Sequence, residues 1–335
     1  MSKKEDEYDE KVFAAFHPYY AQKITEVKPS IEARKTSFVH YTSSGNLLNV
    51  IRGKQFWMRN ASIMNDYSEI QYGIELLATC YRGDPGNRLK GILRKNFGSN
   101  EIAEKLEHYY NGWLKSHMDE TYIVSICEHD QTEDNYGRLS MWRAYAPNSG
   151  VALVLNGSVF TKPSDALGAN TYPVLYADQK KFNSIFDQLV TGLEEIAPSF
   201  EEGNITDSDV LAELLSAFRE FIVTTKHPGF SEEREWRVIY NPQYQHSRYI
   251  TESIECVGSV PQKIQSIPLD TFSSENDDNA EFTIDARIPN LFQRIIVGPS
   301  ETPEVIKGAL AHELEKAEVT DVYEKIVISD IPLRV

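Results

Sequence analysis

The sequence lacks several features that would assign it to a membrane, secreted or metal-binding class. No run of about 18 apolar residues occurs in its 335 positions, so no transmembrane helix is expected. Cysteine is scarce, and the three residues present (Cys80, Cys127 and Cys256) are far apart and odd in number. This usage favours a reduced cytoplasm over a disulfide framework, and the spacing is not that of metal ligands. We therefore expect a cytoplasmic protein without a bound metal.

Basic residues are also in deficit. The chain has 34 Lys and Arg residues against 50 Asp and Glu residues, for a net charge of −16. Because Lys and Arg dominate phosphate binding, this balance argues against a broad nucleic-acid or anionic-membrane surface, although a narrow basic groove remains compatible with it. The first seven residues are mostly charged with no apolar segment behind them, so no signal peptide is expected.

What is present suffices for a large folded core. Hydrophobic residues make up 41% of the chain and aromatic residues 11%. The length favours one large domain with elaborate insertions. We expect residues 1–36 to form a helical, partly disordered leader broken at Pro18 and Pro29, followed by a single domain at 37–335.

Two helical insertions are predicted within that domain, at about 66–118 and 179–226. Both contain apolar residues at helical spacing, a pattern far more typical of a core-facing stripe than of a cofactor site. In the first insertion, the residues expected to pack on the sheet are Ile70, Ile74, Leu106 and Trp113.

The segment from Phe38 to Met58 has the pattern of strand, helix and strand. It opens with a β-rich run, and Ser43 or Ser44 can cap the helix that follows. The apolar residues on one face of that helix are Leu47, Leu48 and Ile51. Gly53 lies near its expected end, and the next strand begins at Gln55.

His40 stands at the end of the first of these strands, beside the start of the helix. Free backbone donors at a helix start favour negative groups, so this is a candidate anion or nucleotide site. A lone histidine in such a place is more often structural than functional.

The order of residues in this segment resembles a known family. His-x-Thr, a short gap, Asn-Leu, an Ile and then a Gly is similar to the opening of ADP-ribosyltransferase folds, including DarT-type toxins and tRNA 2′-phosphotransferases. The resemblance implies NAD as co-substrate, with His40 on the nicotinamide-side ribose and the backbone of Tyr41 on the nicotinamide amide. It also assigns Thr42 and Asn46 to the NAD site. Those families have Gly or a small apolar residue in place of Tyr41, so its side chain must point away from the ligand.

A second segment contains two carboxylates, Glu233 and Glu235, at the head of a predicted strand. The plain interpretation is an edge strand whose alternating Glu and Arg residues form cross-strand pairs. A carboxylate there also suits stabilisation of positive charge in a transition state. ADP-ribosyltransferases place their catalytic Glu at the start of a late strand. The resemblance therefore implies that Glu235 binds the ribose 2′-hydroxyl and stabilises the oxocarbenium-like cation, with Glu233 nearest the acceptor.

The segment Leu139 to Tyr145 supplies the remaining candidates. An aromatic ring must stack on nicotinamide, and Trp142 and Tyr145 are the two candidates, although either is equally typical of a core residue. Arg143 is a candidate for contact with the NAD diphosphate, but an Arg beside a Trp is as often a stacked surface pair.

A wider set of short motifs is similar to an uncharacterised bacterial family, the domain-of-unknown-function family 2971. The set extends over roughly residues 38–328. Its pieces are the His-Tyr pair, Asn-Asp followed by Glu69, Met-Trp with Tyr145, Gly150-Val151, Val174-x-Tyr176, the Glu-x-Glu-Trp-Arg strand and Ile295 to Gly298. The family label conveys no activity.

These observations predict an α+β fold with an ADP-ribosyltransferase-like split β-sheet core, in which His40 and Glu235 face one cleft because a single ribose must reach both. The implied activity is NAD-dependent transfer of ADP-ribose, a glycosyltransferase reaction, to RNA, DNA or protein. It suits a bacterial toxin or antiviral defence effector with an antitoxin or defence partner protein. The alternative is a catalytically silent module of the same fold that binds a nucleotide or a partner. A metal-dependent nuclease has no supporting acidic or His cluster.

Overall fold

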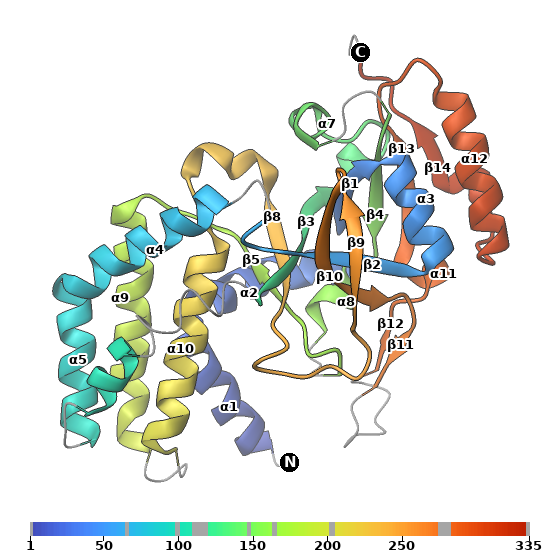
Figure 1. Cartoon of the computed structure of the whole chain (residues 1–335). Coiled ribbons are helices and arrows are strands. Elements are labelled where there is room, and N and C mark those ends of the chain that lie inside the picture. The colour runs from blue at the N-terminus through green and yellow to red at the C-terminus, as the bar shows by residue number, and fades with distance from the viewer. Residues whose placement is uncertain are drawn as a thin grey trace. The chain divides into compact units, whose positions relative to one another are not determined.

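The chain forms two compact units that interleave along the sequence. The computed structural model describes residues 3–63, 67–97, 101–108, 120–145, 149–162, 166–200, 205–273 and 283–332. The first unit comprises Met1–Glu26, Ala61–Thr121 and Tyr172–Ser231, and the second comprises Val27–Asn60, Tyr122–Thr171 and Glu232–Val335. Helices and a multi-stranded sheet are both present, which confirms the α+β class (Figure 1). Within the described ranges, no helix has the length and apolarity needed to cross a membrane.

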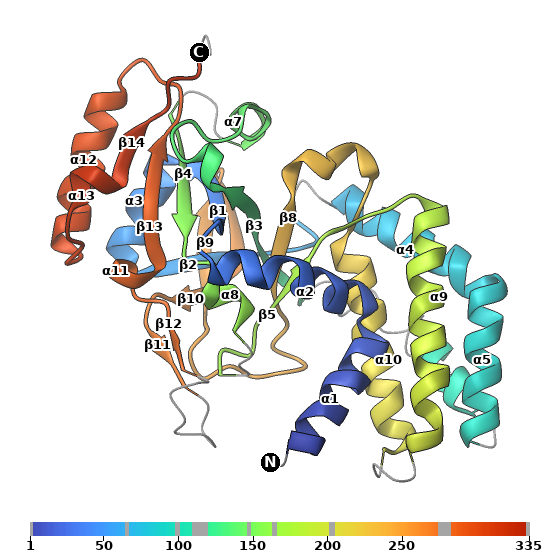
Figure 2. The ribbon, with the colours of Figure 1, turned by 180° about the vertical axis from the view of Figure 1, so that it is seen from behind.

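The first unit is mainly helical, and both predicted helical insertions fall within it. Its helices are α1 (Lys3–Phe16), α4 (Tyr67–Arg82), α5 (Asp84–Phe97), a helix at 101–108, α9 (Gln179–Ile196) and α10 (Asp207–Thr224), with the short helix η2 (Ala197–Ser199) and the paired strands β6 (Leu175–Tyr176) and β7 (Thr225–Lys226). Figure 2 shows the long helices α9 and α10 side by side with α4 and α5.

Two of the four residues that we expected to pack on the sheet are buried in the core of this helical unit. Ile70 is buried and Leu106 has no exposed surface, so their predicted core positions are confirmed. Ile74 is half-buried, and Trp113 lies outside the described residues. Helices α4 and α10 approach closely at Gly73, where an added Cβ would lie 2.5 Å from the carbonyl oxygen of Ile222.

The leader region is helical in its described part. Helix α1 ends before Pro18, which is the first residue of α2 (Pro18–Glu32). Pro29, where we expected a second break, lies inside α2. It removes one hydrogen bond, the one that its N–H would otherwise donate to the carbonyl of Thr25, and the helix continues to Glu32.

The second unit contains the main sheet, whose strands are ordered β14-β13-β4-β1-β3-β2-β10-β9. The strands are β1 (Thr36–Ser43), β2 (Gln55–Asn60), β3 (Tyr122–Asp130), β4 (Gly150–Leu155), β8 (Glu235–Tyr240), β9 (Thr251–Val257), β10 (Val260–Pro268), β13 (Phe292–Val297) and β14 (Ile326–Ile328). The shorter elements are η1 (Gln131–Glu133), α8 (Ser158–Thr161), β11 (Thr271–Phe272), β12 (Ile284–Asp285), α11 (Ile288–Leu291) and α13 (Val322–Lys325). Two further elements, β5 (Asn170–Pro173) and η3 (Pro228–Glu233), cross from one unit's segments to the other's.

The sheet is forked at β3. One edge of β3 pairs with β8 from Tyr122 to Cys127. The other edge is shared, because β2 pairs with Tyr122 and Ile123, whereas β1 pairs from Cys127 onward. Strands β1 and β2 therefore diverge on either side of Ser125.

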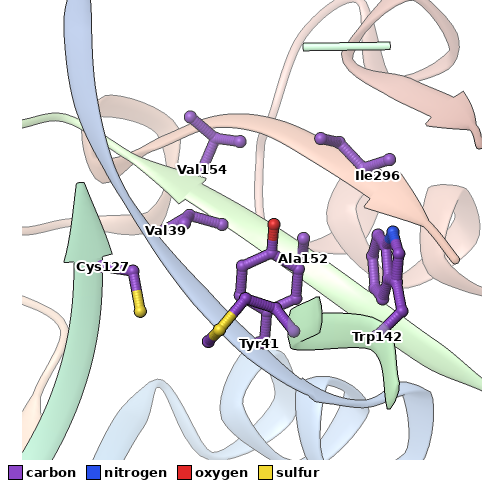
Figure 3. Close-up of a cluster of buried hydrophobic side chains, with 8 residues drawn as sticks. Val39, Tyr41, Cys127, Trp142, Ala152, Val154 and Ile296 are labelled. Atoms are coloured by element: carbon purple, nitrogen blue, oxygen red, sulfur yellow. The ribbon is translucent and has the colours of Figure 1, made fainter. Parts of the chain in front are cut away.

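Helices α3 (Ser44–Gly53), α7 (Leu139–Tyr145) and α12 (Pro303–Lys316) complete the unit. Helix α3 contacts β1 and α12, while α7 packs on β1. The buried cluster beneath α7 consists of Val39, Tyr41, Cys127, Met141, Trp142, Ala152, Val154 and Ile296, most of which Figure 3 labels. This cluster defines the face of β1 that is called the Tyr41 face below.

Candidate functional site

The strand, helix and strand predicted from Phe38 to Met58 are present as β1, α3 and β2. Ser43 is the N-cap, and its side chain accepts a hydrogen bond from the backbone N–H of Asn46 at 3.1 Å. Gly53 is the last helical residue, and Lys54 follows in the left-handed region with φ of 48°. Helix α3 therefore begins and ends where the sequence predicted.

His40 lies at the fork between β1 and β2. Its Nδ1 is 2.8 Å from the backbone carbonyl oxygen of Ser125, at the point on β3 where neither strand pairs. Because a carbonyl only accepts hydrogen bonds, Nδ1 carries the proton. The ring also meets Phe56 edge to face, with centroids 5.7 Å apart. Burial lowers the pKa of His40, which keeps the ring neutral.

Thr42 and Asn46 lie close to each other at the end of β1. The side-chain amide of Asn46 donates to the Thr42 hydroxyl at 3.2 Å. Thr42 and His40 are two residues apart on a regular strand, so they share a face. Three of the predicted NAD-site residues are therefore brought to the same side of β1.

Tyr41 and Trp142 lie on the other face and belong to the core. The Tyr41 hydroxyl accepts a hydrogen bond from the backbone N–H of Arg138, and burial raises its pKa. Its ring meets Trp142 edge to face at 4.9 Å. Trp142 has no exposed surface, and its indole N–H donates to the Tyr136 carbonyl. A ring so enclosed cannot stack on a ligand unless the core opens.

Tyr145 and Glu233 meet at the surface of the second unit. The side chain of Tyr145 is 45% exposed, and its hydroxyl donates to a carboxylate oxygen of Glu233 at 2.9 Å. Of the two candidate stacking aromatics, Tyr145 is the one that solvent reaches. Arg143, whose contact with a diphosphate stays a prediction, is also exposed.

Arg138 connects the segments of this region by hydrogen bonds, although no sequence motif indicated it. Its Nε and Nη2 donate to the Glu133 carboxylate at 3.1 Å. Nη1 donates to the carbonyl oxygens of Glu232 and Glu233, each at 3.0 Å, and Nη2 also donates to that of Glu128 at 2.8 Å. All five N–H groups of the guanidinium are used. Arg138 thus links the residues just before β8 to β3.

Glu235 is enclosed in an ion pair with Arg237. The Arg237 Nε lies 2.9 Å from Oε1 of Glu235, and its Nη2 lies 3.4 Å from Oε2. The two residues are 5% and 1% exposed. They are two positions apart on β8 and therefore share a face, as the alternation predicted.

The expectation that His40 and Glu235 face one cleft is wrong. Val39 pairs with Cys127, and Cys127 pairs with Glu235, so these three side chains lie on the Tyr41 face. His40 follows Val39 and points to the opposite face. The sequence indicated both strands, but not the register that decides which face each residue takes.

The roles of these residues in NAD chemistry stay predictions. Within the described ranges, no group of three or more His, Cys, Asp and Glu side chains is arranged to hold a metal ion. The predicted site is therefore divided. His40, Thr42 and Asn46 lie on one side of β1, and Glu235 lies on the Tyr41 face. Tyr145 and Glu233 meet at the surface of the unit.

Comparison with known proteins adds one match. Residues 141–238 match the family model DUF2971, a protein of unknown function. The matched segment begins within α7 and ends within β8, so it includes Tyr145 and Glu235 but not His40. No curated protein and no solved structure matches the chain. The match supports the resemblance to this family of unknown function over that segment.

Proposed function

We propose that the chain is a partner-binding module built on an ADP-ribosyltransferase-like split sheet, and that Glu235 has a structural rather than a catalytic role. The observation that carries this proposal is the enclosed ion pair between Glu235 and Arg237, on the face of the sheet opposite His40. A carboxylate that stabilises a ribosyl cation must face the ribose. Here its charge is neutralised by a neighbouring guanidinium.

The fork in the sheet supports the fold part of the proposal. Two strands that diverge from one edge of β3 agree with a split-sheet core, and the β1-α3-β2 opening agrees with the motif order. In this arrangement His40 has a structural use, because it supplies a hydrogen bond to a β3 carbonyl that lacks a paired strand at the fork.

The surface at Tyr145 supports a protein partner. Tyr145 and Arg143 are exposed, and Tyr and Arg are enriched at protein interfaces. The Glu233 carboxylate lies at the same place, and the chain has a net charge of −16. Electrostatic complementarity therefore favours a basic partner.

Site-specific photo-crosslinking in the native host tests this surface. A photoreactive phenylalanine analogue replaces Tyr145 in one variant and Tyr323, which is 61% exposed on α13, in a matched control. We expect a discrete crosslinked species from position 145 that Glu233→Gln weakens. Crosslinking that is equal at both positions would contradict a specific surface.

A second candidate is NAD-dependent ADP-ribosyl transfer at Tyr145 and Glu233. The contact between these two residues favours it, since it joins the exposed candidate for nicotinamide stacking to the candidate acceptor-side carboxylate. In this alternative Glu233, which is partly exposed, takes the cation-stabilising role that Glu235 cannot take from its present position.

Nicotinamide release separates the two candidates. Purified protein is incubated with NAD and with RNA, single-stranded DNA or cell lysate, and released nicotinamide is measured. We expect none from the wild-type protein. Release that is lost in both Glu233→Gln and Tyr145→Ala would establish the second candidate. Release that is lost in Glu235→Gln, at unchanged stability, would return catalysis to Glu235.

A further inference from the structure

A polar pocket lies in the second unit at the end of the sheet where β1 begins. It has a volume of about 660 Å³. Phe38 in β1, Leu155 in β4 and Phe292 in β13 are register partners, so the start of β1, the end of β4 and the start of β13 meet at this end. The lining residues that matter here are Arg34, Thr36, Ser37, Asn156, Lys162 and Gln293.

Two side-chain amides in the pocket have their oxygens engaged. Oδ1 of Asn156 accepts hydrogen bonds from the backbone N–H and the hydroxyl of Ser158, at 3.2 and 2.9 Å. Oε1 of Gln293 accepts a hydrogen bond from the Ser37 hydroxyl at 2.8 Å. An amide whose oxygen is engaged offers its NH₂ group, so both residues present donors to a ligand.

Two cationic side chains add further donors. Lys162 donates to the carbonyl oxygen of Thr283 at 2.7 Å and brings its positive charge to the pocket. Arg34 is exposed, and its backbone has a φ of 56°, with its carbonyl oxygen accepting from the Gln131 side chain. The backbone contacts hold Arg34, which is exposed, at the pocket wall.

The carboxylates in the lining are Asp285 and Glu32. Asp285 is paired with Arg287, whose Nε and Nη2 lie 2.9 and 2.6 Å from its oxygens, and Asn290 also donates to it. These hydrogen bonds lower the pKa of Asp285 to about 2, so it is ionised but neutralised by Arg287. The lining thus contains two cationic groups, Arg34 and Lys162, and two carboxylates, of which Asp285 is already paired with Arg287.

We infer that this pocket binds a phosphomonoester of a small hydroxyl-bearing molecule, of the sugar phosphate class. Arg34, Lys162 and the two amide NH₂ groups supply donors for phosphate oxygens. The Thr36 hydroxyl shares a hydrogen bond with Ser30 and the Ser37 hydroxyl donates to Gln293, and both oxygens retain capacity to accept from hydroxyls of the ligand. The volume exceeds that needed for inorganic phosphate and lies in the range of about 300–1,000 Å³ typical of small-molecule sites.

Calorimetric titration of the full chain with ribose 5-phosphate, ribose and inorganic phosphate tests the inference. We expect ribose 5-phosphate to bind, inorganic phosphate to bind more weakly, and ribose to give no binding at the same concentrations. Absence of binding by ribose 5-phosphate would overturn the inference. Binding of ribose with equal affinity would overturn the role of the phosphate.

Substitutions of lining residues test whether ribose 5-phosphate binds in this pocket. Arg34→Ala and Lys162→Met should each weaken ribose 5-phosphate binding by about 10-fold or more, because each removes a charge-assisted hydrogen bond. Lys35→Ala removes the same charge from an exposed neighbour outside the lining and should leave the affinity unchanged. An equal loss in Lys35→Ala would contradict a built site.

A further variant keeps the test valid if Arg34→Ala fails to fold. Gln293→Leu changes no charge and should weaken binding of ribose 5-phosphate while the melting temperature stays near that of the wild type. Unaltered affinity in a folded Gln293→Leu variant would place the ligand elsewhere. The site uses no residue of α7 or β8, so its failure leaves the partner-binding proposal untouched.

Discussion

Glu235 and Arg237 neutralise each other on one face of β8, with almost no surface of either side chain exposed. Removing one partner of a buried ion pair leaves the other charge buried and uncompensated, which typically costs about 3–5 kcal/mol. We expect Glu235→Gln and Arg237→Gln each to lower the free energy of unfolding by about that amount, as measured by urea denaturation.

The double variant tests whether the two effects share one origin. If they do, the combined loss should fall well short of the sum of the single losses. Glu233→Gln is the matched control, and because Glu233 is partly exposed it should cost no more than about 1 kcal/mol. Strictly additive losses would mean that the two residues act separately.

Arg138→Lys should destabilise the entry to β8. Lysine keeps the charge but lacks the planar fork that reaches Glu133 and the carbonyl oxygens of Glu128 and Glu232 together. We expect a loss of about 2–4 kcal/mol and faster amide hydrogen exchange at the start of β8. Arg143→Lys, at an exposed position on the helix α7 that follows Arg138, should show neither effect.

Leu106→Ala should lower the free energy of unfolding by about 2–4 kcal/mol, because it leaves a cavity at a position with no exposed surface. Thermal or denaturant unfolding measures the loss. Glu104→Ala, at an exposed position two residues earlier, serves as the control and should stay within about 0.5 kcal/mol of the wild type.

His17 gives the first unit a stability that depends on pH. Burial by itself lowers the pKa of His17, but contacts with Glu220 and Glu213 outweigh it and raise that pKa from 6.5 to about 9. A pKa raised in the folded state stabilises the protein fully below the unfolded value, and the stabilisation disappears as pH rises through the folded value. The free energy of unfolding should therefore fall between pH 6.5 and 9, by up to about 3 kcal/mol.

The variant His17→Gln isolates this contribution. Subtracting its pH profile from that of the wild type removes the titration of other groups. The difference should be largest near pH 6 and should shrink toward pH 9. A difference that is constant across this range would show that His17 contributes packing but no proton linkage.

The sequence predicted features that depend only on residues close together in the chain, such as the limits of α3. The hydroxyls at Ser43 and Ser44, the apolar spacing in α3 and the position of Gly53 all act within a few residues, and the structure agrees with each. The core position of Leu106 follows from helical periodicity for the same reason.

Long-range relationships could not be predicted in this way. The face that Glu235 takes depends on its pairing with Cys127 of β3. The residue pattern of β8 alone does not specify this register. The clamp by Arg138 joins carbonyl oxygens from two distant segments, and backbone carbonyls leave no trace in side-chain patterns. The enclosure of Trp142 by Tyr41 likewise depends on how α7 docks on β1.

The fork at β3 has a consequence for the order in which the chain folds during synthesis. Strands β1, β2, β3 and β4 emerge from the ribosome first, yet β8 covers one edge of β3 and β13 covers one edge of β4 only much later. Until then, these strand edges remain open to pairing with other chains. Such non-local pairing slows folding and exposes intermediates to aggregation. A nascent chain halted before Phe292 should therefore need chaperones to stay soluble.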